Sequence, residues 1–130
     1  MQYLSPLTNL KGLNLSCNNL NKNYENKKNF SSSIKHLLLL TKLNYLDLAW
    51  NQLDDINVEP LSLFTNLIKL DLSSNQFSDA SIKYLKQLSN LEELDIRYNH
   101  FSSNRARHFI EYMDFINQTF VRNISIIGSY

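Results

Sequence analysis

The sequence is organised by an eleven-residue pattern that occurs four times. The copy at Leu67–Phe77 reads Leu-Ile-Lys-Leu-Asp-Leu-Ser-Ser-Asn-Gln-Phe, which has the form Leu-x-x-Leu-x-Leu-x-x-Asn-x-apolar. The other copies are Leu10–Leu20, Leu43–Leu53 and Leu91–Phe101. Self-similarity at a period of roughly 20 to 50 residues is typical of repeat architectures, in which single units bury too little surface and must stack into one core. Four copies are enough for such a stack, so the pattern predicts a solenoid.

Each copy has the alternation of a short strand followed by a residue suited to a turn. In Leu70-Asp71-Leu72 the apolar residues alternate, which places both leucines on one face of an extended chain. The asparagine stands where the chain leaves the strand, and its amide can bond main-chain groups of neighbouring turns. We therefore predict a structural asparagine ladder, formed by Asn18, Asn51, Asn75 and Asn99.

The whole chain, residues 1–130, is predicted to be a single domain. Residues 121–130 repeat the first half of the pattern in degenerate form, which predicts a fifth strand at Asn123–Ile127. Residues 21–33 form the most polar stretch, which predicts an exposed insertion. Short helices are predicted in the connections: one after Ser31–Ser33, at most one or two turns near Pro60, one from Ser78 or Asp79 to about Leu88, and one after Ser102-Ser103 to about Phe120.

The four motifs resemble those of the leucine-rich-repeat family, and the resemblance covers essentially the whole chain. It implies an α/β solenoid, with a curved parallel sheet of about five short strands on the concave side and helices and irregular turns on the convex side. It also implies binding of a protein or peptide to the concave sheet. The spacings between copies vary (33, 24, 24 and about 30 residues), and no end cap is recognisable.

Composition excludes several other classes of protein. The formal net charge is +1 with both signs spread along the chain, so we expect neither nucleic acid nor a membrane surface as a partner. The single cysteine, Cys17, favours a reducing compartment. Residues 1–6 lack the basic start and apolar core of a signal peptide. We expect a cytoplasmic protein, with export by a route that needs no such signal left open.

The sequence also offers no catalytic or metal-binding constellation. His36, His100 and His108 fall in three different connections without metal-ligand spacing. Cys17 has no base nearby in the sequence, and the only glycines, Gly12 and Gly128, make no phosphate-binding loop. We therefore expect no enzyme, no cofactor and no metal.

Residues beside the strand leucines are expected to face away from the core. These are the third, fifth, seventh and eighth positions of each copy, so Ala49 and Ser73 belong to this face together with the candidate partner-binding residues. The candidates are Tyr45, Asp47, Trp50, Lys69, Asp71, Glu93, Asp95, Arg97 and Tyr98.

Two features of this predicted face have more than one interpretation. Trp50 either belongs to a binding surface, since Trp, Tyr and Arg are enriched at binding hot spots, or folds over the rim onto the next repeat. The column of Asp47, Asp71 and Asp95 either receives a basic side chain or a cation, or is framework shared by such repeats.

The primary hypothesis is a non-catalytic interaction module that binds a protein or peptide partner through the concave sheet. One alternative is a structural segment that associates end to end through uncapped repeats. Another is the substrate-recognition part of a larger signalling or effector protein. The contact surface in any of these is the concave face, the convex helices or the loop at 21–33.

Overall fold

A computed structural model of the chain describes residues 7–21, 30, 33–117 and 123–125. Five short strands form one parallel sheet, ordered β1-β2-β3-β4-β5 as in the sequence. The strands are β1 (Gly12–Asn14), β2 (Tyr45–Asp47), β3 (Lys69–Asp71), β4 (Glu93–Asp95) and β5 (Asn123–Ser125). The connections carry the helices: the 3₁₀ helices η2 (Lys35–Leu39), η3 (Glu59–Leu63) and η4 (Asp79–Ser81), and the α-helices α2 (Asp55–Val58), α3 (Ile82–Leu85) and α4 (Ser103–Asn117).

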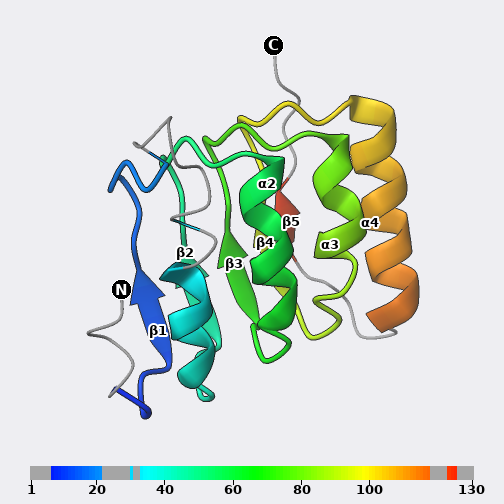
Figure 1. Cartoon of the computed structure of the whole chain (residues 1–130). Helices are drawn as coiled ribbons and strands as arrows, with labels where there is room; N and C mark the ends of the chain where they lie inside the picture. The colour runs from blue at the N-terminus through cyan, green and yellow to red at the C-terminus, as the bar shows by residue number, and fades with distance from the viewer. Residues whose placement is uncertain (1–6, 22–29, 31–32, 118–122, 126–130) are drawn as a thin grey trace.

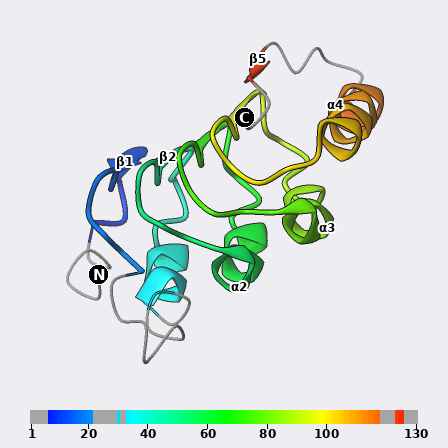
Figure 2. The same cartoon turned by 90° about the horizontal axis from the view of Figure 1, so that it is seen from above.

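The chain winds as a curved solenoid. Figure 1 shows the strands side by side with the helices in a second layer in front of them. Seen from above in Figure 2, the strands follow the inner side of the curve and the helices follow the outer side. The predicted α/β solenoid with a concave parallel sheet is confirmed, and its fifth strand pairs in parallel with β4.

Apolar side chains of the motif form one continuous core between the two layers. The register pairs Leu13 with Leu46, Leu46 with Leu70, Leu70 with Leu94 and Leu94 with Ile124. The three central leucines of this row are almost completely buried. Each deeply buried leucine contributes on the order of 2 kcal/mol to folding, so the row stabilises the stack through contacts between repeats.

The helices in the connections of the central repeats are short, because a repeat of 24 residues leaves little chain outside the motif. Near Pro60, α2 runs directly into η3, and Asp54 and Asn57 form a capping box at the start of α2. Ser78 caps η4, as predicted, by accepting a hydrogen bond from the N–H of Ala80. The helix that follows ends at Leu85 rather than Leu88.

The other two predicted helices are also present. The first is the 3₁₀ helix η2, which follows the predicted Ser31–Ser33 segment. Its N-cap residue is Ile34, which makes no side-chain capping bond, and Ser31 lies outside the described residues. The last, α4, buries Phe109 and Met113 against the core, as its periodicity predicts. No helix among the described residues has the length and apolarity needed to cross a membrane.

Candidate functional site

The concave face consists of rows that run across the strands, because equivalent residues of successive repeats are in register. The third position of the motif gives the row Gly12, Tyr45, Lys69 and Glu93. The fifth position gives the row Asn14, Asp47, Asp71 and Asp95. The eighth position, just beyond the strands, gives the row Cys17, Trp50, Ser74 and Tyr98. The three rows differ in what holds their side chains.

Third-position side chains interact with one another along the row. The ring of Tyr45 packs beside Gly12, where an added Cβ would lie 3.2 Å from the Cδ1 atom of the tyrosine. The ammonium group of Lys69 lies 5.7 Å from the centre of the Tyr45 ring and 2.7 Å from a carboxylate oxygen of Glu93. Partial burial, followed by the charge of Asp47, raises the pKa of the Tyr45 hydroxyl. This row is a band of polar groups that already have partners within the face.

Fifth-position side chains bond the backbone of their own turn. The side-chain oxygens of Asp47, Asp71 and Asp95 accept a hydrogen bond from the N–H two residues later, at 2.9–3.0 Å. Asn14 does the same with the N–H of Ser16 at 2.9 Å. Because the uncharged Asn14 makes the same bond, the position serves the turn that ends each strand. These bonds favour the framework interpretation of the aspartate column.

Two candidate residues are less accessible than the sequence predicts. Asp47 is buried, and so are Ala49 and Ser73 at the seventh position, because the chain turns inward after the fifth position and covers them. Arg97 turns back along its own strand: its Nε atom donates to both carboxylate oxygens of Asp95, at 3.0 and 2.9 Å. This hydrogen bond and the carboxylate charge raise the pKa of Arg97. We therefore do not count Asp47 and Arg97 among the open contact residues.

The eighth-position row combines large exposed side chains with an unusual backbone. Trp50 is 64% exposed and Tyr98 is 61% exposed. Both have a φ of 57°, and Cys17 and Ser74 have φ values of 58° and 55°. The turn thus imposes a left-handed conformation on every repeat, and this conformation is rare and strained for bulky residues. The alternative that Trp50 packs against the next repeat does not fit its exposure.

The two aromatic side chains stand on either side of a small residue. The N–H of Trp50 bonds the carbonyl of Ser73 at 3.1 Å, and the N–H of Ser74 bonds the carbonyl of Arg97 at 2.9 Å, so the row continues the parallel register of the sheet. At roughly 4.8 Å between neighbouring strands, the backbones of Trp50 and Tyr98 lie about 10 Å apart. Ser74, which lies between them, has a small side chain and is half-buried.

The ninth position contains three of the four members of the predicted asparagine ladder, whereas the fourth, Asn18, is exposed and its Nδ2 atom donates to the carbonyl of Ser16 in its own turn. The Oδ1 atom of Asn75 accepts from the N–H groups of Asn51 and Leu53 in the preceding repeat, at 3.1 and 2.9 Å. Its Nδ2 atom donates to the carbonyls of Leu48, Leu72 and Ser73. In the same way, the Oδ1 atom of Asn51 accepts from the N–H groups of Asn18 and Leu20, and that of Asn99 accepts from the N–H group of Phe77. All three amides are buried, and each links its own turn to the turn before it.

Two further inter-repeat contacts were not predicted from the sequence. Before the strands, Asn66 donates to the carbonyl of Thr41 and Asn90 donates to that of Thr65, at 3.1 and 2.8 Å. The signal for this contact is the Thr/Ser-Asn-Leu sequence that opens three of the four copies. On the convex side, a second set of bonds follows one shared scheme, with aspartates of one repeat accepting from serines of the next. Asp55 accepts from Ser78 and Ser81, and Asp79 accepts from Ser102.

The remaining residues considered from the sequence do not come together in the structure. Cys17 is an exposed free thiol, and the three histidines are exposed as well. The prediction that they fall in three different connections is wrong: His36 lies in η2, but His100 and His108 both lie between β4 and β5. Within the described part of the chain, no three His, Cys, Asp or Glu side chains are grouped to hold a metal ion. Most of the predicted insertion at 21–33, including its lysines, lies outside the described residues.

Comparison with known proteins gives a match to a family model over part of the chain and a match of the fold to solved structures. Residues 41–101 match the family model described as leucine rich repeat. No curated protein matches the chain. Among solved structures, internalin C2 from Listeria monocytogenes is 24% identical with a TM-score of 0.58, over 99% of this chain and 46% of that one. Internalin F from the same organism is 19% identical with a TM-score of 0.55, over 100% and 38%.

A third structure extends the similarity to a protein of another kind. The actin-binding site 2 of leiomodin-1 is 14% identical with a TM-score of 0.68, over 99% of this chain and 78% of that one. The chain therefore spans less than half of the two internalins and about three quarters of the leiomodin-1 fragment. At these identities the similarity to solved structures concerns the fold alone.

Proposed function

We propose that this chain, in which residues 41–101 match the leucine-rich-repeat family model, is a member of that family, whose members typically bind proteins, and that it is a non-catalytic module that binds a protein partner on its concave face. The contact is centred on Trp50 and Tyr98, with Ser74 between them. Tyr45, Lys69 and Glu93 provide a polar border along the strands. The leiomodin-1 fragment is an actin-binding site, which supports a protein as the class of partner but, at 14% identity, does not support actin itself.

The observation that carries the proposal is the combination of strain and exposure at the eighth position. A left-handed conformation costs roughly 1–2 kcal/mol for a residue with a Cβ atom, and Gly or Asn adopts it more easily. Trp50 and Tyr98 bear this cost while their rings remain more than 60% exposed to solvent. Burial returns little of that free energy, so folding alone does not account for these two residue types.

The geometry between the rings also fits a protein ligand. Aromatic rings interact favourably with a group whose centre lies about 4.5–7 Å away. The two rings rise from backbones about 10 Å apart, which is close enough for one ligand side chain between them to contact both rings when they face it. Tyr and Trp bring large contact areas at low cost in conformational entropy, because each has only two rotatable side-chain bonds.

The proposal is tested by capture of partners from a lysate of the native host. A Trp50→Ala/Tyr98→Ala variant is compared with a Leu39→Ala/Leu63→Ala variant, which removes two similarly exposed apolar side chains (58% and 54%) from the convex side. Captured proteins are identified by mass spectrometry at matched folding, checked by circular dichroism and urea unfolding. We expect the aromatic variant to lose the protein captured by the wild type and the convex variant to keep it. Retention by the aromatic variant would refute the proposal.

A further inference from the structure

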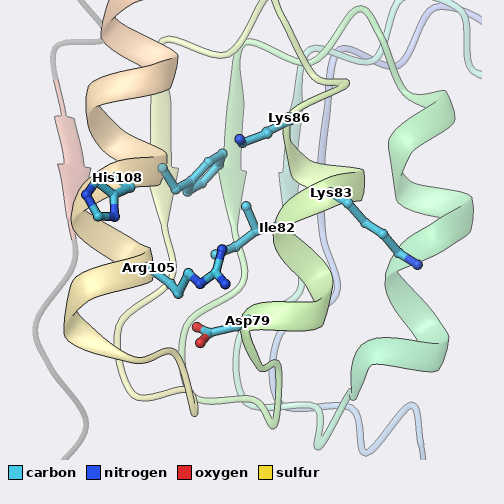
Figure 3. Close-up of a pocket in the computed structure, with 7 residues that line it drawn as sticks. Asp79, Ile82, Lys83, Lys86, Arg105 and His108 are labelled. Carbon is cyan, nitrogen blue, oxygen red and sulfur yellow. The ribbon is translucent and has the colours of Figure 1, made fainter.

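A second candidate site lies on the opposite side of the molecule, between α3 and α4. A hollow of about 260 Å³ opens there to solvent. Its lining is Asp79, Ile82, Lys83, Lys86, Arg105, His108 and Phe109. Figure 3 shows Arg105 and Lys86 extending into the space between the two helices, whereas the ends of the Lys83 and His108 side chains point away from it. Because this hollow is on the convex layer, it is separate from the concave face.

The lining carries more positive than negative charge. Lys86 and Arg105 direct two positive charges into the space between the helices. The single acidic group, Asp79, already accepts hydrogen bonds from the N–H and hydroxyl of Ser102, at 2.9 and 2.7 Å. The charged groups that face the hollow, Lys86, Arg105 and Asp79, therefore sum to +1, and both cations are directed into it. A concave surface lined by one sign of charge focuses the field on a ligand of the opposite sign.

The connection next to the hollow on the convex layer carries charge of the opposite sign. The equivalent connection one repeat earlier, α2 and η3, contains Asp54, Asp55 and Glu59 and no basic residue. Repetition of the fold therefore does not require basic side chains here. A ligand with an extended run of phosphates, such as a nucleic acid, would meet these acidic groups beside the hollow, and such ligands favour a continuous basic track.

Apolar contacts in and around the hollow favour a polypeptide as the ligand. Phe109 is buried and Ile82 is half-buried, and both line the hollow. The ammonium group of Lys86 lies 4.1 Å from the centre of the Tyr112 ring, and that of Lys83 lies 4.7 Å from the Tyr84 ring. The cation–π contact of Lys86 restricts its side chain, so less conformational entropy is lost when it binds a carboxylate.

We propose that the hollow between α3 and α4 binds an acidic segment of a polypeptide, with carboxylates at Lys86 and Arg105 and an apolar side chain against Ile82 and Phe109. This site is independent of the contact proposed for the concave face. The chain then has two binding surfaces of different chemistry, an aromatic surface on the inner side of the curve and a basic one on the outer side.

The test uses fluorescence anisotropy of a labelled peptide of alternating Glu and Leu residues and of its twin with Gln in place of Glu. Both are titrated with the full chain and with two charge-reversal variants. Lys86→Glu/Arg105→Glu changes the hollow, and Lys35→Glu/Arg107→Glu makes the same change in net charge at exposed residues outside it. We expect the acidic peptide to bind, its affinity to fall by about tenfold or more in the first variant, and by less than about twofold in the second.

Several results would overturn the proposal. Equal losses in the two variants would indicate non-specific attraction of charge, and equal binding of the Gln peptide would remove the role of the carboxylates. Tighter binding of a duplex DNA or an anionic lipid vesicle, lost in the first variant alone, would assign the hollow to another class of ligand. A neutral variant, Lys86→Gln/Arg105→Gln, repeats the test if charge reversal disturbs folding. Trp50→Ala/Tyr98→Ala should bind the peptide normally, which separates this result from that of the concave face.

Discussion

Two neighbouring rows of the same turn, the ninth-position asparagines and the eighth-position side chains, differ in almost every physical respect. Asn51 is completely buried, and its amide bonds backbone groups of its own turn and of the turn before it. Trp50, one residue earlier, is 64% exposed and strained at a φ of 57°. One row holds the repeats together, and the other is available for contact. Residues that stabilise the fold and residues that are proposed to bind the partner are therefore neighbours in the sequence.

The largest expected effect comes from removing a ladder amide. Asn75→Ala leaves the N–H groups of Asn51 and Leu53 without their acceptor. Because each buried donor without a partner costs about 1–3 kcal/mol, we expect the free energy of unfolding to fall by roughly 3 kcal/mol in urea titrations. The control is Asn66→Ala, an exposed asparagine with one bond to Thr41, for which we expect less than about 1 kcal/mol. Similar losses in the two variants would remove the special role of the ninth position.

A smaller effect on stability measures the backbone strain in the eighth-position row. Both Trp50→Ala and Trp50→Gly remove the indole ring, but only glycine relieves the left-handed conformation. After the entropic cost of glycine in the unfolded chain, we expect Trp50→Gly to be more stable than Trp50→Ala by about 0.5–1 kcal/mol. The reverse order is expected for the same pair at Glu92, which has no positive φ. A Trp50→Ala variant more stable than Trp50→Gly would show that the backbone at position 50 is not strained.

The hydrogen bonds between aspartates and serines on the convex side make the stability of the fold depend on pH. Burial alone would raise the pKa of Asp55, but the hydrogen bonds from Ser78 and Ser81 outweigh it and lower the pKa below the ordinary value. A lowered pKa in the folded state means that the carboxylate stabilises the fold above its unfolded pKa of about 4, and that this contribution is lost as the pH falls through the folded pKa. We expect the urea midpoints of the wild type and Asp55→Asn to differ most above pH 4 and to converge below it. A constant difference across this range would contradict the assignment.

The smallest expected effect on stability concerns the polar row of the concave face. Lys69 and Glu93 are both substantially exposed, and exposed ion pairs contribute little to folding. We therefore expect no measurable change in the urea midpoint for Lys69→Ala. A clear loss of stability would move Lys69 from the contact residues to the framework.

The fold can be predicted well from the sequence because the leucines and the asparagine of the motif mark the buried positions. Leu70, Leu72 and Asn75 recur at fixed spacing, and their spacing alone specifies strand, turn and stacking. The short convex elements are less predictable, since capping and 3₁₀ geometry depend on contacts between repeats, such as those of Asp55 with Ser78.

The candidate site is predicted only in outline. Alternation along a strand indicates that positions beside the leucines face away from the core, but it does not show where the strand ends. For that reason Asp47 is placed on the open face although the turn buries it, and Arg97 is treated as available although it pairs with Asp95. The left-handed backbone at Trp50 and Tyr98 has no signal in the sequence, because these residue types do not favour it.

The most direct test of the central claim uses the only tryptophan of the chain, Trp50, as its own reporter. In the free protein we expect emission typical of a solvent-exposed indole and efficient quenching by acrylamide. When the captured partner is added to saturation, the account predicts a shift of the emission to shorter wavelength and protection from the quencher. Unchanged emission and quenching in the saturated complex would show that the partner binds elsewhere and would contradict the assignment of the concave aromatic row.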